Sequence, residues 1–223
     1  MSFNITLESS DQHNFQAYLA KPSTSPKGCV VIVQEIFGVT QHIQQVTDRF
    51  ASEGYLALSP CLFDRVGSDI KLNYDSSGVS KGRNLKDQVD EYSELDIQAA
   101  IEHLQSSGPV AVVGFCWGGS LAWRVATDPN NNNLASAVSY YGGELPALAN
   151  RSLICPFMAH FGIHDGSIPE KDARAFAAYQ PKVGTYFYDA GHGFNCNDRD
   201  QYNEFAARTA WGRTIDFLAD CFV

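Results

Sequence analysis

The chain has 223 residues, of which 44% are apolar and 18% are charged, as is typical of one globular α/β domain with a substantial core. Its net charge of −9, without any cluster of Lys or Arg, excludes a nucleic-acid footprint. No apolar run approaches the roughly 18 residues that cross a bilayer. Residues 1–6 lack the basic start and apolar core of a signal peptide, so the sequence predicts a cytoplasmic protein without a membrane segment.

The predicted elements begin with a hairpin. Residues 3–7 and 14–20 alternate between apolar and polar side chains and are separated by polar residues, which predicts two antiparallel strands. Next come an apolar strand at Cys29–Gln34, a helix at Gln41–Glu53 and a strand at Tyr55–Ser59. Residues 60–82 show little periodicity, so we expect a loop that lines a surface or a site.

The rest of the chain alternates helices and strands. An amphipathic helix is predicted over Asn84–Gln105 and a buried strand over Val110–Val113. The later predicted elements are a helix at Ser120–Ala126, strands at Ala135–Tyr141 and Pro156–Phe161, a helix at Pro169–Gln180, a strand at Thr185–Tyr188 and a closing helix at about Gln201–Cys221. This alternation predicts one α/β domain over residues 1–223, with a mostly parallel, twisted sheet covered by helices on both faces. Ligands of such sheets bind outside the carboxyl ends of the strands.

The six cysteines are scattered, without a C-x-x-C pair. In a reducing compartment most cysteines are small buried hydrophobic residues. Cys29, Cys61 and Cys155 fit that description, because they lie in or beside apolar strand-like runs. Cys116 differs from them because glycines flank it.

Cys116 lies in Gly114-Phe115-Cys116-Trp117-Gly118-Gly119, between a predicted strand and a predicted helix. The pattern G-x-C-x-G is that of a nucleophile elbow with sulfur in place of the serine oxygen. The glycines permit a sharp turn, and the start of the helix directs N–H groups and a positive dipole end at the sulfur, which favours the thiolate. Taken alone, the pattern is equally consistent with an ordinary tight turn.

An acid and a histidine follow at the ends of two later strands. Asp165 comes just after the strand at Pro156–Phe161, and His192 comes just after the strand at Thr185–Tyr188. The chain order nucleophile, acid, base is that of α/β-hydrolases. Asp165 would orient the imidazole of His192, which would exchange protons with the sulfur, water and leaving group. Singly, Asp165 could form a turn and His192 could cap a loop; together with Cys116 they predict a catalytic triad.

Two other histidines are expected to have no catalytic part. His160 lies within a strand and is predicted to be structural, whereas His164 is predicted to be solvated or to cap a turn. Residues four apart share a face only on a helix, and no H-E-x-x-H motif is present. The sequence therefore predicts no metal and no cofactor.

A carboxylate stands directly after the first parallel strand, in Gln34-Glu35-Ile36-Phe37-Gly38. An acid at the end of an apolar strand is unusual unless it is solvated or paired. One interpretation is a hydrated loop glutamate. The other places Glu35 opposite Cys116, with the N–H groups of Ile36 and Trp117 as an oxyanion hole, where one donor is worth roughly 3 kcal/mol in acyl transfer.

Together these motifs resemble the dienelactone hydrolase (carboxymethylenebutenolidase) family of α/β-hydrolases over nearly the whole chain. The resemblance rests on residues 34–38 and 114–119, on Ser59-Pro60-Cys61-Leu62-Phe63-Asp64, on Asp165 and on Gly191-His192-Gly193-Phe194. It implies a compact α/β-hydrolase fold without a lid domain, in which a Cys-His-Asp triad opens strained enol-lactones. It also implies that Glu35 holds the resting cysteine until substrate binding releases the thiolate.

A cysteine nucleophile suits such substrates. A thiolate attacks an activated ester without strong deprotonation in the transition state, and a neutral resting thiol resists oxidation. Thiolate is also a good leaving group, so the acyl-cysteine reverts to substrate unless the product enolate leaves better. We therefore predict a preference for esters with acidic leaving groups over simple alkyl esters.

The substrate-binding residues follow the family pattern less closely. The resemblance implies two arginines for the substrate carboxylate, one of them shortly after the histidine, but Cys196 stands at the fourth position after His192. Arg199 is the nearest arginine, Arg83 is a candidate for the second, and Phe37 is a further candidate for substrate contact. Each arginine is otherwise a surface charge, so acceptance of dienelactone itself stays open.

The leading prediction is a monomeric hydrolase whose partner is a small-molecule ester or lactone, with neither nucleic acid nor membrane involved. One alternative is a broader carboxylesterase or thioesterase that uses the same triad. Another is a thiol-based sensor or binding protein, although no resolving cysteine is evident in the sequence.

Overall fold

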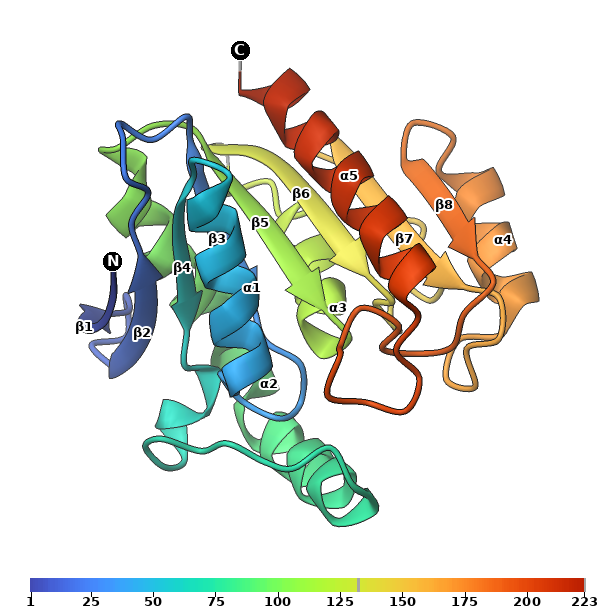
Figure 1. Cartoon of the computed structure of the whole chain (residues 1–223), viewed down its shortest axis with the longest axis horizontal. Helices are drawn as coiled ribbons and strands as arrows, with labels where there is room; N and C mark the ends of the chain where they lie inside the picture. The colour runs from blue at the N-terminus through green and yellow to red at the C-terminus, as the bar shows by residue number, and fades with distance from the viewer. Residues whose placement is uncertain (132, 223) are drawn as a thin grey trace. The chain divides into compact units, whose positions relative to one another are not determined.

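A computed structural model describes residues 1–131 and 133–222. The chain forms two compact units, Met1–Val112 and Val113–Val223 (Figure 1). The single domain expected over residues 1–223 stays a prediction. The sequence also predicts a polar loop over residues 130–133, of which Asn132 lies outside the described residues. Within the described part of the chain, no helix is both long and apolar enough to cross a bilayer.

The first unit contains four strands in the order β1-β2-β4-β3. The predicted hairpin is confirmed: β1 (Ser2–Glu8) pairs antiparallel with β2 (Asn14–Ala20). β4 (Leu56–Pro60) runs antiparallel to β2 and parallel to the wholly buried β3 (Cys29–Val33). The unit also contains the start of β5 (Val110–Phe115).

Two helices cover opposite faces of these strands (Figure 1). α1 (Gln41–Ser52) begins where the Thr40 hydroxyl accepts a hydrogen bond from the Ile43 N–H at 3.4 Å. α2 (Ser76–Gln105) packs against β1, β3 and β4. Both faces of the strands are therefore shielded, as the apolar run of β3 requires.

The loop expected over residues 60–82 is wrong in two places. A short 3-10 helix, η1 (Leu62–Arg65), follows β4, and α2 begins at Ser76 rather than at Asn84. Asp75 caps α2, because its carboxylate accepts a hydrogen bond from the Gly78 N–H at 2.7 Å. The first turns of α2 are rich in Ser and Gly and lack an apolar stripe, so periodicity did not reveal them.

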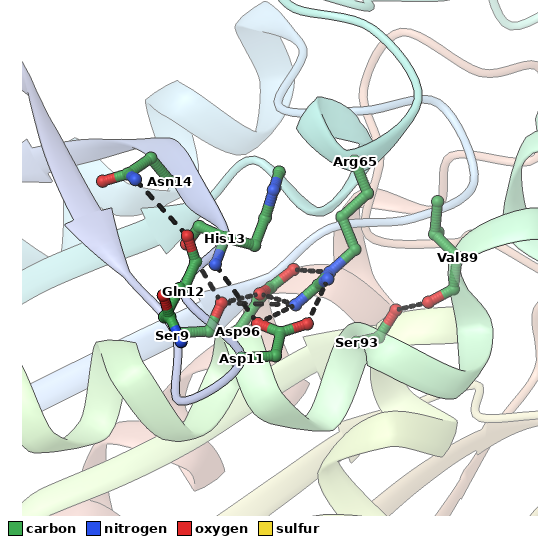
Figure 2. A network of polar contacts seen from close by, with 9 residues as sticks. All are labelled: Ser9, Asp11, Gln12, His13, Asn14, Arg65, Val89, Ser93 and Asp96. Carbon is green, nitrogen blue, oxygen red and sulfur yellow. Dashed lines mark hydrogen bonds and ion pairs between the residues drawn. The ribbon is translucent and has the colours of Figure 1, made fainter.

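A charged network joins three elements of the first unit (Figure 2). Arg65, from η1, forms ion pairs at 2.7 Å with Asp96 on α2 and with Asp11 in the β1–β2 turn. The Ser9 hydroxyl donates to the wholly buried Asp96 carboxylate at 2.6 Å. The hydrogen bond from Arg65 lowers the pKa of Asp11 to about 2. The network therefore fixes the hairpin turn to η1 and α2.

The second unit contains the end of β5 followed by β6, β7 and β8, in that order. β6 (Leu134–Tyr140), β7 (Phe157–Gly162) and β8 (Gly184–Tyr188) pair in parallel. The helices of this unit are α3 (Trp117–Val125), α4 (Glu170–Tyr179) and α5 (Glu204–Cys221). α3 and α5 lie on opposite faces of the strands (Figure 1). The carboxyl ends of these strands, where ligands are expected, carry the predicted catalytic residues.

Candidate active site

Cys116 occupies a strained turn between β5 and α3. Its φ is 55° and its ψ is −117°, a conformation that a residue with a side chain rarely adopts. The Cys116 N–H donates to the Tyr140 carbonyl at 2.9 Å, which fixes the turn to the end of β6. A Cβ at Gly114 would lie 1.8 Å from the Gly118 oxygen, so the turn requires glycine there. The sharp turn predicted from the sequence is present.

The structure brings Cys116, His192 and Asp165 together. His192 Nε2 lies 3.1 Å from Cys116 Sγ, and His192 Nδ1 lies 2.7 Å from an Asp165 carboxylate oxygen. The other Asp165 oxygen accepts hydrogen bonds from the N–H groups of Ser167 and Ile168 at 2.7 and 3.1 Å. Because Asp165 is held in this way, it fixes the orientation of the imidazole toward the sulfur.

The His192 imidazole is bordered by two acidic groups. Burial by itself lowers its pKa, but the negative sulfur of Cys116 and hydrogen bonds to Asp165 and Cys116 raise it. The net effect raises the pKa of His192 from 6.5 to about 10. The raised pKa favours the protonated imidazole of His192 at neutral pH.

The three cysteines that were predicted to be apolar packing residues lie in surroundings that differ from those of Cys116. Cys29 and Cys155 are buried and Cys61 is half-buried. Burial raises the pKa of Cys29 to about 11 and the pKa values of Cys61 and Cys155 to about 12. These three thiols are therefore neutral at physiological pH, as expected of apolar packing residues.

Tyr141 is a site residue that the sequence reasoning missed. It follows β6 directly, is fully buried, and has a φ of 43°. Its ring centroid lies 5.1 Å from that of His192 and 5.3 Å from that of Phe194. The available signal was an aromatic residue at a strand end before two glycines, Gly142 and Gly143, in the same position relative to its strand as Cys116.

The two other histidines of this unit differ in surroundings. His164 is exposed, as expected, and its Nε2 pairs with Asp189 at 2.5 Å. His160 is fully buried within β7. Among residues 1–131 and 133–222, no three His, Cys, Asp or Glu side chains are grouped so that they could hold a metal ion.

Two further predicted residues lie in the second unit. Trp117 is the first residue of α3. The first backbone N–H groups of a helix take no part in the hydrogen bonds within that helix. Arg199 is half-buried, and its guanidinium packs against Gly193, where an added Cβ would lie 2.5 Å from an arginine nitrogen. Arg199 therefore contacts the loop that carries His192. Cys196, at the position where the family pattern has arginine, is buried.

The predicted residues of the first unit surround the turn after β3. Glu35, Ile36 and Phe37 are all buried there. The Phe37 carbonyl accepts a hydrogen bond from the Leu72 N–H at 2.9 Å, which fixes the turn to the segment before α2. Arg83 is exposed and lies on α2, which begins before the predicted helix start at Asn84. The parts assigned to these residues stay predictions.

Comparisons with known proteins place the chain in a family. The model of the dienelactone hydrolase family matches residues 15–222. The chain is 34% identical to a candidate carboxymethylenebutenolidase of Synechocystis sp., covering 95% of this chain and 94% of that protein. It is 30% identical to the carboxymethylenebutenolidase of a Pseudomonas species, covering 96% and 93% of the two chains.

A crystal structure from Klebsiella pneumoniae, described as a candidate dienelactone hydrolase, has a similar fold. The TM-score is 0.82 at 27% identity, with 98% of this chain and 99% of that chain covered. This match confirms the predicted α/β-hydrolase fold class.

Proposed function

The chain belongs to the dienelactone hydrolase family, and from this premise we propose that it hydrolyses small activated esters or lactones through an acyl-cysteine. Membership of this family makes the chain a hydrolase of ester or lactone bonds. The finer proposal is that Cys116 is the nucleophile, His192 the proton carrier and Asp165 the group that orients His192. The proposed reaction uses no cofactor.

One observation carries this proposal: His192 lies within hydrogen-bond reach of both Cys116 Sγ, at 3.1 Å, and the Asp165 carboxylate, at 2.7 Å. A nucleophile next to a base, and a base oriented by a third group, is the arrangement that activates weak nucleophiles. The strained turn at Cys116 supports the same assignment, because such strain accumulates at functional sites.

In the first half of the reaction, the Cys116 thiolate attacks the carbonyl carbon and forms a tetrahedral intermediate. The Trp117 N–H is proposed to donate to the oxyanion, as a group already in place where charge develops. The intermediate then collapses, and the bond between its central carbon and the oxygen of the leaving group breaks. His192 then gives its proton to the departing enolate or alkoxide.

In the second half, the neutral His192 takes a proton from water, and the resulting hydroxide attacks the acyl-cysteine. The sulfur leaves as thiolate and the carboxylic acid product is released. Asp165 holds the imidazole and stabilises its cationic form in both halves. The parts of Glu35 as holder of the resting cysteine and of Ile36 as second oxyanion donor stay predictions.

The chemistry of the leaving group narrows the proposed substrates. The tetrahedral intermediate expels the better leaving group, which is either the Cys116 thiolate or the oxygen anion of the substrate's leaving group. An enolate or phenolate competes with the thiolate, whereas an alkoxide does not. Enol-lactones and aryl esters are therefore proposed as substrates ahead of ethyl esters. Arg199, beside the His192 loop, is the proposed contact for an anionic substituent on the substrate.

The test is hydrolysis of 4-nitrophenyl acetate by the parent and by Cys116→Ala. We expect kcat/KM to fall about 1,000-fold or more, because the members of a triad act as a unit. Cys221→Ala is the matched control, since Cys221 is a half-buried thiol at the end of α5, and it should keep the parent rate.

Equal turnover by Cys116→Ala and the parent would remove Cys116 from the mechanism. Faster hydrolysis of ethyl acetate than of phenyl acetate by the parent would contradict the proposed leaving-group preference and favour a broader carboxylesterase.

A further inference from the structure

A buried polar network lies below the candidate active site in the second unit, and the mechanism above does not use it. Its centre is His160, fully buried in the middle of β7. His160 Nδ1 lies 2.8 Å from the Tyr188 hydroxyl, and His160 Nε2 lies 3.1 Å from the Thr214 hydroxyl. Thr214, on α5, is also 2.7 Å from the Tyr140 hydroxyl. β6, β7, β8 and α5 are thus joined through side chains.

The contact with Arg213 favours one direction for the hydrogen bonds of this network. Arg213 Nη1 donates to the Tyr188 hydroxyl at 3.1 Å, so the single Tyr188 proton is left to donate to His160 Nδ1. Burial, and then the charge of Arg213, lower the pKa of His160 to about 3, so the ring is neutral. Its one proton therefore sits on Nε2 and is donated to Thr214.

The same residues hold the catalytic strand ends through their backbone. The Tyr140 carbonyl accepts the Cys116 N–H at 2.9 Å, and the His160 carbonyl accepts the Tyr141 N–H at 2.8 Å. Tyr141 in turn packs its ring against His192. The network thus reaches the nucleophile through β6 and the imidazole through Tyr141.

Tyr188 makes the corresponding link on the other side. Its carbonyl accepts hydrogen bonds from the Ile163 N–H at 2.9 Å and the Ala190 N–H at 2.8 Å. Ile163 lies two residues before Asp165, and Ala190 lies two residues before His192. Each of the three strand ends that carry the candidate triad is therefore attached to a residue whose side chain belongs to the network.

We infer that His160 is a positioning residue, which sets the spacing between Cys116, His192 and Asp165 by joining the strands that carry them. This inference rests on the proposed function. Displacing a reacting group by about 1 Å can cost about 100-fold in rate, so a side chain remote from the chemistry can still govern kcat. The hydrogen bonds of His160 with Tyr188 and Thr214 join buried, uncharged side chains, which suits this purpose because such bonds keep their directions across the working pH range.

The test compares His160→Leu with His160→Gln. Leucine leaves the Tyr188 and Thr214 hydroxyls without their histidine partner, whereas glutamine offers one acceptor and one donor. For His160→Leu we expect kcat for 4-nitrophenyl acetate to fall about 10- to 100-fold with KM within about twofold. His160→Gln should recover most of that loss. Each rate is divided by the concentration of enzyme whose Cys116 thiol reacts with iodoacetamide.

Two tyrosines on β8 provide a matched pair. Tyr188→Phe removes a network hydroxyl, whereas Tyr186→Phe removes a hydroxyl from a ring that stacks on His160 without entering the network. Tyr188→Phe should lower kcat and Tyr186→Phe should not. This pair also tests the inference if His160→Leu does not fold, since each change deletes one oxygen.

The rate at which iodoacetamide alkylates Cys116 separates this inference from the proposed function, because alkylation needs no ester turnover. Slower alkylation in Tyr188→Phe and His160→Leu supports positioning even if Cys116→Ala retained esterase activity. A lower melting temperature with unchanged kcat and alkylation rate per thiol would show a purely structural part for His160 and overturn the inference. Failure of glutamine to do better than leucine would also overturn it.

Discussion

At the residue scale, Cys116 and His192 form an electrostatic pair. The two atoms are 3.1 Å apart, and the negative sulfur is the largest of the influences that raise the pKa of His192. Asp165 alone would leave a smaller shift. The pairing therefore has a measurable consequence in the titration of His192.

We predict that Cys116→Ser lowers the pKa of His192 from its value of about 10 in the parent. Serine keeps the hydrogen-bonding position but carries no negative charge near neutral pH. NMR titration of 15N-labelled histidine would measure the change, with the other histidines as internal references. An unchanged titration of His192 in Cys116→Ser would show that the sulfur does not carry the charge.

The sign of the pH effect on stability follows from the same shift. The pKa of His192 is raised above its ordinary value of 6.5, so its stabilising contribution is complete below pH 6.5. That contribution is lost as the pH rises through about 10.

At the element scale, long-range polar contacts fix how helices and turns meet. In the first unit, Asp96 on α2 binds Arg65 of η1 and Ser9 at the end of the β1–β2 hairpin. Asp96 is fully buried and the Arg65 side chain is only 10% exposed. The contact with Ser9 spans 87 residues of sequence, so no local pattern could have indicated it.

We expect Asp96→Ala to lower the free energy of unfolding by about 3 kcal/mol, because it leaves a mostly buried guanidinium without its main partner. Asp69→Ala is the matched control: it breaks an exposed ion pair with Lys71 and should cost less than about 1 kcal/mol. Chemical denaturation followed by circular dichroism would measure both. Equal losses in the two variants would contradict the importance assigned to the buried network.

At the scale of the whole chain, the sequence predicted the order and approximate bounds of the eight strands found among residues 1–131 and 133–222. Period-two alternation marked the hairpin, continuous apolar runs marked buried strands, and glycines marked the turn at Cys116. The three candidate residues were also found from their position, because Cys116 directly follows β5, whereas Asp165 and His192 lie in the short segments after β7 and β8. The structure brings these three side chains together, whereas their catalytic parts remain proposals.

What the sequence could not predict depends on tertiary contacts. The first turns of α2 have no apolar stripe and begin at the Asp75 cap, so periodicity placed the helix start too late. Tyr141 contacts His192 because two strand ends meet in space, which no spacing along the chain indicates. The network around His160 joins residues from four elements for the same reason.

The central claim is that Cys116 is acylated during turnover, and rapid-quench peptide mass spectrometry after mixing with 4-nitrophenyl acetate tests it most directly. We expect an acetyl group on the peptide that contains Cys116 within the first turnover, and none on that peptide in Cys116→Ala. An acetyl group on a different residue, or full turnover without any acetyl group on Cys116, would contradict the account.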